Sequence, residues 1–269
     1  MRSAEVVELE RLGAEAQRHL VSVLARQDPS WGSTTFGVAD GWAVLAGPGL
    51  FVNQVMAAGL IEPITHDDID AVVDRATQVG VTPAFEFCDA TRTDAVTALR
   101  ERSWLPNDNQ IVMAHGLGSI PEAIPGIDIA FIGEAELPIW QLCSAVGWGH
   151  TSAAAQAAND AFSAAAFETD RPGLLLARDS LDGRPLACAT LRISHGVAVL
   201  GGMSTRPEER RRGAHAALIS WRLRYAEEHD CRYAISLARR GGDSARNLLR
   251  FGFTPAYTKT VWQMIETGA

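Results

Sequence analysis

Apolar side chains recur along the first residues of the chain with the period of an α-helix. The residues that share one helical face predict an opening helix over residues 4–25; they are Val6, Leu9, Gly13, Ala16, Leu20, Val23 and Leu24. Short apolar and alternating segments then predict strands at Thr34–Val38, Trp42–Ala46 and Phe51–Leu60.

The rest of the first half alternates between helical and strand patterns. Thr65-His-Asp-Asp68 resembles a capping box, with Asp in place of Glu, and Ile64 and Ile69 can form the flanking staple. We therefore expect a helix from there to about Val79. A strand, a helix and a final strand are expected at Thr82–Cys88, Thr93–Arg102 and within Trp104–Ala114. Pro121, Pro125 and Gly126 mark a junction.

The second half has the same plan. It predicts a strand at Ile127–Ile132, helices at Glu134–Val146 and Thr151–Phe167, and a hairpin of Leu174–Arg178 and Leu186–Arg192 around Asp182-Gly183. A strand at Val197–Met203 and a helix from Ala214 follow, and then a strand at Tyr233–Ala238, a short helix from Asp243 to about Phe251, and a last strand at Phe253–Met264. Leu99–Pro106 and Leu248–Pro255 are similar in sequence and hold equivalent positions, so the halves read as a degenerate repeat.

The segment between the Val197–Met203 strand and the following helix is rich in arginine. It reads Thr-Arg-Pro-Glu-Glu-Arg-Arg-Arg-Gly-Ala-His, residues 205–215. A helix start leaves backbone N–H groups without partners and carries partial positive charge. Gly213 lets an anion approach the backbone closely, and Arg210, Arg211 and Arg212 add positive charge. The segment therefore predicts a phosphate-binding loop, although it is neither a Walker loop nor a GxGxxG turn.

This loop resembles the acyl-CoA pyrophosphate loop of the GNAT superfamily of N-acetyltransferases, Arg/Gln-x-x-Gly-x-Gly/Ala. Here it reads Arg210-x-x-Gly213-x-His215, and the sixth position departs from the family pattern. The resemblance implies an α/β (α+β) fold of two GNAT-like domains, each a mixed, mostly antiparallel sheet flanked by helices. It covers the second half well and the first half loosely. Residues 1–120 are expected to form a degenerate GNAT-like domain, since residues 61–66 hold no arginine or glycine, with an unrelated α/β cap as the alternative. Residues 121–269 are expected to form the CoA-binding domain.

The downstream segment Asp243–Phe253 resembles the GNAT helix that lies beside the pantetheine arm. Many members carry a tyrosine four residues before its closing glycine, as the acid that reprotonates the CoA thiolate, and this chain has Leu248 there. Asn247 is expected as a CoA contact by resemblance, with a plain helix-surface amide as the alternative. Ser204 and Tyr257 are the candidate catalytic residues, each with an ordinary structural role as its alternative.

The resemblance implies acyl-CoA, in the first place acetyl-CoA, as cofactor. The expected cofactor-binding residues are Met203, Ser204, Thr205, Arg210, Arg211, Arg212, Gly213, Ala214, His215, Ala216 and Asn247. The expected function is acetyl transfer to a small-molecule or peptide amine by direct attack on the thioester. A non-catalytic acyl-CoA-binding or sensing protein is the alternative, because the tyrosine is missing and no carboxylate lies on Val197–Met203.

Composition limits the function classes. The chain has 269 residues, of which 47% are hydrophobic, and a net charge of −8, which disfavours nucleic acid as a partner. No apolar run is long enough to span a bilayer, and the N-terminus lacks a signal-peptide core, so we expect a cytoplasmic protein. The four cysteines are widely spaced and no metal-ligand pattern is present, which predicts reduced thiols and no metal site. The sequence leaves open whether the protein forms a homodimer.

Overall fold

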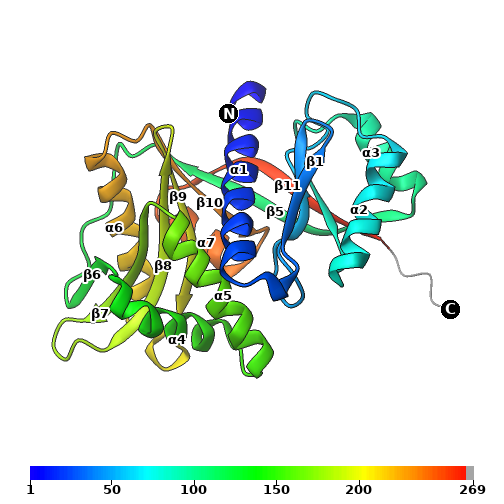
Figure 1. Ribbon diagram of the computed structural model, residues 1–269. Helices are drawn as coiled ribbons and strands as arrows, with labels where there is room; N and C mark the ends of the chain where they lie inside the picture. Colours follow the sequence, from blue (N-terminus) through cyan, green and yellow to red (C-terminus); the bar gives the residue numbers. More distant parts are fainter. Residues whose placement is uncertain (265–269) are drawn as a thin grey trace. The chain divides into compact units, whose positions relative to one another are not determined.

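The computed structural model describes residues 1–264, and its chain forms two compact units (Figure 1). Unit 1 comprises residues 1–111 together with the end of the chain from residue 256, and unit 2 comprises residues 112–255. The last strand therefore belongs to the unit formed by the first half of the sequence. These units are defined by the contacts between residues. The division predicted at residue 120 separates two domains that are related in sequence, and it stays a prediction.

Unit 1 is a sheet flanked by three helices. Its helices are α1 (Ser3–Gln27), α2 (His66–Val79) and α3 (Thr93–Glu101), with the 3-10 turn η1 (Pro29–Trp31). Its strands are β1 (Thr34–Val38), β2 (Gly41–Leu45), β3 (Asn53–Met56), β4 (Ala84–Cys88), most of β5 (Trp104–His115), and β11 (Thr254–Met264) from residue 256. Their order is β1-β2-β3-β4-β11-β5. β3 and β4 are parallel, and the other recorded pairs in the unit are antiparallel.

The core of unit 1 lies between its sheet and helices α2 and α3. Phe85 contacts both Phe87 and Trp104 edge to face, and Val72 and Leu99 are fully buried in the same cluster. The predicted capping box is confirmed, because Thr65 and Asp68 bond reciprocally at the start of α2. β3 is shorter than predicted, since the chain turns at Ala57 and Gly59, which both have positive φ.

The strands of unit 2 follow the order β5-β10-β9-β8-β7-β6 in a mixed sheet, to which β5 contributes its last residues from Val112. The strands are β6 (Ile127–Phe131), β7 (Pro172–Asp179), β8 (Pro185–Ser194), β9 (Val197–Thr205) and β10 (Tyr233–Arg239). The helices are α4 (Leu137–Trp148), α5 (Ala153–Thr169), α6 (Ala214–Glu228) and α7 (Asp243–Arg250), with the 3-10 turns η2 (Glu134–Glu136) and η3 (Pro207–Glu209). Figure 1 shows α6 and α4 on opposite faces of this sheet.

The two halves of the sequence share one order of elements. The first half contains the elements β1-β2-β3-α2-β4-α3-β5 in this order. The second half contains β7-β8-β9-α6-β10-α7-β11, which are strands and helices in the same order. In each half the third and fourth of these strands are the parallel pair, β3 with β4 and β9 with β10. The repeat inferred from the sequence therefore appears in the element order. The mixed α/β architecture with a mostly antiparallel sheet is confirmed.

Candidate acyl-CoA site

The arginine-rich loop joins the end of β9 to the start of α6. The chain leaves β9 at Thr205, forms η3, and turns through Arg211 and Gly213, which both have positive φ, 65° and 88°. Glycine suits the second turn because a Cβ there would lie 3.3 Å from Cγ2 of Ile124 and because the left-handed region strains other residues. The loop thus has the local geometry expected from its sequence.

The N-terminus of α6 has no capping side chain among the described residues. Its N-cap residue is Gly213, which has no side-chain oxygen to accept from the first N–H groups, and the first turn holds no acidic residue. Arg210 and Arg211 are exposed beside it, and Arg210 Nη2 donates to the Gly147 carbonyl at 3.4 Å. Free N–H groups and positive charge at a helix start form an anion-binding site.

Arg212, by contrast, is held by carboxylates. Its Nη2 donates to Asp179 Oδ2 at 2.7 Å, and its Nη1 donates to Glu209 Oε2 at 2.7 Å. Arg184 contacts the same two carboxylates at 3.1 Å. The Glu209 side chain raises the pKa of Arg212, and the Leu181 N–H together with the two guanidinium groups lowers the pKa of Asp179. Arg212 therefore orders the loop through ion pairs with β7 and η3.

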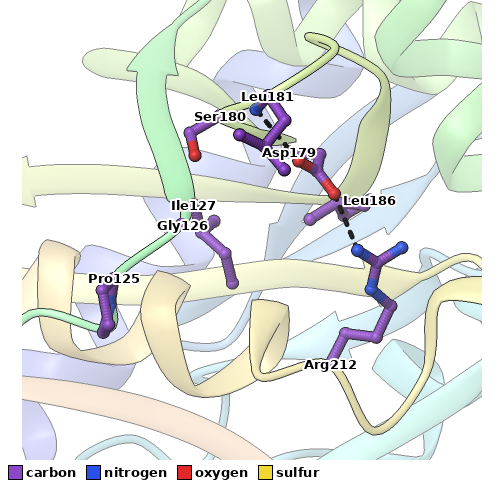
Figure 2. Close-up of a pocket in the computed structure, with 8 residues that line it drawn as sticks. All are labelled: Pro125, Gly126, Ile127, Asp179, Ser180, Leu181, Leu186 and Arg212. Atoms are coloured by element: carbon purple, nitrogen blue, oxygen red, sulfur yellow. Dashed lines mark hydrogen bonds and ion pairs between the residues drawn. The ribbon is translucent and has the colours of Figure 1, made fainter.

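A pocket lies beside these ion pairs. Figure 2 shows the Arg212 side chain reaching toward the Asp179 carboxylate, with Pro125, Gly126 and Ile127 on the side of the chain that enters β6. The pocket is lined by both charged and apolar groups, including Leu181 and Leu186. Because its two charged groups pair with each other, the free positive charge of the loop comes from Arg210 and Arg211.

β9 separates from β10 in front of this loop. The two parallel strands pair over three positions, from Val197 with Tyr233 to Val199 with Ile235. β9 then carries a bulge, because its register with β8 slips by one residue between Ser204, opposite Cys188, and Gly201, opposite Thr190. Bulges bend a strand and increase its twist. The recorded pairing with β10 ends at Val199, before this bulge, and we infer that the bend makes the two strands diverge beyond it.

The predicted residues at the end of β9 differ in how their side chains are used. The buried Ser204 hydroxyl lies 3.4 Å from the Ser144 carbonyl on α4, to which it donates. Thr205 Oγ1 is buried, and no partner for it is recorded among residues 1–264. A buried hydroxyl without a partner is costly. Of the two, Thr205 therefore has a free polar group beside the loop.

His215 and Asn247 are placed by the two helices of the predicted site. His215 lies in the first turn of α6, where burial lowers its pKa to about 4 and the Arg222 guanidinium acts in the same direction. Its imidazole is therefore neutral near neutral pH. Asn247 is half-buried on α7, and its side-chain oxygen accepts from Arg250 at 3.3 Å.

On α7, a core residue occupies the position at which many GNAT members carry a tyrosine. Leu248 is 1% exposed and fills apolar space. Tyr257 belongs to unit 1, where its hydroxyl donates to Glu10 Oε1 at 2.7 Å, and burial raises its pKa. Tyr257 therefore has a structural partner of its own within unit 1.

Sequence reasoning missed one residue of this region. Arg222, on α6, is 1% exposed and contacts the bulge of β9. Trp221 and Tyr225 on the same helix are half-buried and stack on each other, while Arg222 between them in sequence is buried. The Gly201-Gly202 pair inside a strand was the available signal for the bulge.

Comparison with known proteins agrees with this geometry. Residues 137–253 match the Acetyltransferase (GNAT) family, and they include the loop, α6 and α7. The chain therefore contains a GNAT acetyltransferase domain over these residues. No curated protein matches the sequence.

Solved structures share the fold at low sequence identity. A GCN5-related N-acetyltransferase from Kribbella flavida has a TM-score of 0.63 and 18% identity, over 93% of this chain and 96% of its own. A tandem GNAT protein from the clavulanic acid biosynthesis pathway has a TM-score of 0.62 and 13% identity, over 97% of this chain and 93% of its own. A functionally unknown conserved protein from Staphylococcus epidermidis ATCC 12228 has a TM-score of 0.62 and 11% identity, over 87% of this chain and 96% of its own.

Residues 1–264 hold neither a membrane-spanning helix nor a cluster of metal ligands. No helix in this part of the chain is both long and apolar enough to cross a membrane. The same residues contain no cluster of three or more His, Cys, Asp or Glu side chains that could hold a metal ion. All four cysteines are free thiols.

Proposed function

We propose that this protein is an acyl-CoA-dependent N-acyltransferase that uses acetyl-CoA and transfers the acetyl group to a small-molecule or peptide amine. The observation that carries the proposal is the uncapped start of α6 at Gly213, flanked by the exposed Arg210 and Arg211. Such a terminus suits a pyrophosphate, because it offers N–H donors and positive charge together.

The residues present fit CoA in the following way. The N–H groups of Ala214, His215 and Ala216, with Arg210 and Arg211, would hold the pyrophosphate. Arg212 would keep the loop in shape through its ion pairs with Asp179 and Glu209. The pantetheine arm would lie where β9 and β10 diverge, beside Met203, Ser204 and Thr205, with Asn247 on α7 as a further contact. The orphaned Thr205 hydroxyl would gain a partner there.

The chemistry then depends on placement. The thioester would supply the acyl group: a backbone N–H would polarise its carbonyl, a neutral amine would form the new C–N bond and give up its proton to water, and the C–S bond would break to release the thiolate. A thiol has an ordinary pKa of roughly 8.5, so the thiolate would be able to leave near neutral pH and would take its proton from water. Because Leu248 offers no acid, turnover lacks the roughly 10²–10⁴-fold help of a general acid.

A non-catalytic acyl-CoA-binding protein is the second candidate, and one observation favours it. The residue at the usual position of the acid, Leu248, is buried in apolar surroundings, and β9 carries no carboxylate. The two candidates differ in turnover. Release of free thiol from acetyl-CoA in the presence of any member of a broad amine panel would exclude the second candidate, and tight binding without release would favour it.

The binding site is tested by a double variant, Arg210→Ala with Gly213→Val. Each lost charge-assisted hydrogen bond costs on the order of 1.5–3 kcal/mol, and a Cβ at position 213 would crowd Ile124 in a strained backbone. Calorimetry should therefore show no CoA binding at ordinary ligand concentrations. The control is Arg75→Ala, which removes an exposed arginine from α2 in unit 1. Unchanged CoA affinity in the double variant would refute the site.

A further inference from the structure

Arg222 is an arginine in the interior of unit 2 that the proposed chemistry leaves unexplained. Its side chain extends from α6 and is 1% exposed. Nε donates to the carbonyl of Leu218, on its own helix, at 3.0 Å. Nη1 donates to the carbonyls of Thr190 at 3.0 Å and Gly201 at 3.2 Å, and Nη2 contacts the thioether sulfur of Met203 at 3.0 Å. The acceptors are thus carbonyls and a thioether.

This placement is unfavourable for a guanidinium without a carboxylate partner. A buried charge is normally paired, whereas no ion pair of Arg222 is recorded among residues 1–264. Burial consequently lowers the pKa of Arg222 to about 9. The neighbouring carbonyls offset part of the cost, so the residue and the backbone that surrounds it depend on each other.

That backbone is the bulge of β9. Thr190 and Gly201 face each other immediately beside the register slip, and Nη1 donates to the carbonyls of both. Gly202, the next residue, has a φ of 54°, and a Cβ there would lie 2.8 Å from Cγ2 of Thr190. The guanidinium therefore joins β8, β9 and α6 at the point where β9 bends.

We propose that Arg222 is a positioning residue: its buried guanidinium fixes the bulge of β9 and thereby sets the backbone of Met203–Thr205 that receives the acyl group. The inference rests on the proposed function, because it needs a thioester between β9 and β10. Arg222 does not touch the donor itself. It acts through the shape of the strand, whereas the loop at Arg210–Ala216 provides the affinity for the CoA portion.

This division gives Arg222 a signature that a general loss of stability does not produce. Acetyl-CoA and CoA share every contact of the loop, and they differ in the acyl group alone. In Arg222→Met the affinity for acetyl-CoA should fall about tenfold, the worth of one hydrogen bond, while the affinity for CoA stays as in the wild type. Calorimetric titration of the full chain with each compound measures both.

Two further variants separate position from folding. Arg224→Met is the matched control, because Arg224 lies on the same helix but donates to the Pro121 carbonyl, and it should change neither affinity. Gly202→Ala strains the same bulge from β9, so it should reproduce the selective loss. The effects of Arg222→Met and Gly202→Ala should not add, because both act through one element.

Each outcome bears on one proposal. If folded Arg222→Met keeps the wild-type preference for acetyl-CoA over CoA, the positioning role is wrong. If Arg222→Met does not fold, the same preference for acetyl-CoA over CoA is measured in Gly202→Ala and in Arg222→Lys. Arg222→Lys keeps the charge but loses the planar fork, and a wild-type preference in both variants would overturn the positioning role. A wild type that binds both compounds equally also overturns the inference. A wild type that binds neither overturns the proposed function as well.

Discussion

His215 is the residue at which the loop departs from the GNAT pattern, and its burial has a thermodynamic consequence. The sixth position of the pattern is usually glycine or alanine, while here an imidazole lies in the first turn of α6 beside Arg222. A protonated imidazole would add charge at the proposed pyrophosphate site. Burial instead lowers its pKa to about 4, so the loop obtains its positive charge from arginine and from the helix start.

The protein should lose stability in mild acid, and the loss should depend on His215. The unfolded chain takes up the proton near pH 6.5, while the folded protein does so at about 4. Between these values the unfolded state binds more protons, so the free energy of unfolding falls as the pH falls, by about 3 kcal/mol in all for this group. Chemical denaturation at several pH values should show a flatter profile for His215→Gln. Parallel profiles for variant and wild type would contradict the assignment.

Some features of individual residues could be predicted from the sequence, and others could not. The loop at residues 205–215 was predictable, because glycine, arginine and the flanking apolar periods are all local signals. The burial of Arg222 was not, since its acceptors come from β8 and β9 and depend on a register slip. The hydroxyl partner of Tyr257 was equally unpredictable, because Glu10 lies at the other end of the chain.

At the scale of elements, the starts of α2 and α6 hold equivalent positions in the two halves but differ in chemistry. The start of α2 is closed: the Thr65 hydroxyl accepts from the Asp68 N–H at 3.1 Å, and the Asp68 carboxylate accepts from the Thr65 N–H at 2.8 Å. Asp67 adds negative charge in the same turn. The start of α6 is uncapped and flanked by arginines. We therefore propose that residues 1–120 form a degenerate GNAT-like domain that binds no CoA.

The corresponding prediction is a stoichiometry of one CoA per chain. A phosphate at the start of α2 would meet two carboxylates and N–H groups that already have acceptors. Calorimetric titration of the full chain should therefore give a single site, and the Arg210→Ala, Gly213→Val variant should remove it entirely. Two equivalent sites, or residual binding of similar affinity in the variant, would contradict the degenerate role of the first half.

The elements themselves could largely be predicted from sequence, and the exceptions have local causes. Alternation and helical period indicated the helices and most strands, including the hairpin of β7 and β8. The strand predicted at Phe51–Leu60 was too long, because left-handed residues at Ala57 and Gly59 end β3 early. The position of β11 next to β4 could not be predicted, since strand order depends on contacts between segments far apart in sequence.

For the whole molecule, a buried charge cluster joins β11 to β4 and α1 within unit 1. Lys259 Nζ on β11 lies 2.6 Å from Glu86 Oε1 on β4 and 3.1 Å from Glu10 Oε1 on α1. Glu86 directly follows the last parallel pair of β3 and β4, Val55 with Phe85. Burial raises the pKa of Glu10, and although burial alone would lower that of Lys259, the facing carboxylates raise it. The ammonium thus compensates two carboxylates.

The prediction at this scale is that the fold of unit 1 depends on this one ammonium. Lys259 is the sole lysine of the sequence, and no other cation contacts Glu10 or Glu86 among the described residues. Removing one partner of a buried ion pair typically costs about 3–5 kcal/mol, so Lys259→Met should lower the free energy of unfolding by that amount. Denaturant unfolding measures the loss. A triple variant that adds Glu10→Gln and Glu86→Gln should recover part of this stability, because no uncompensated charge then stays buried. If Lys259→Met lowers the free energy of unfolding by less than about 1 kcal/mol, as the loss of an exposed ion pair does, the cluster does not hold β11 in unit 1.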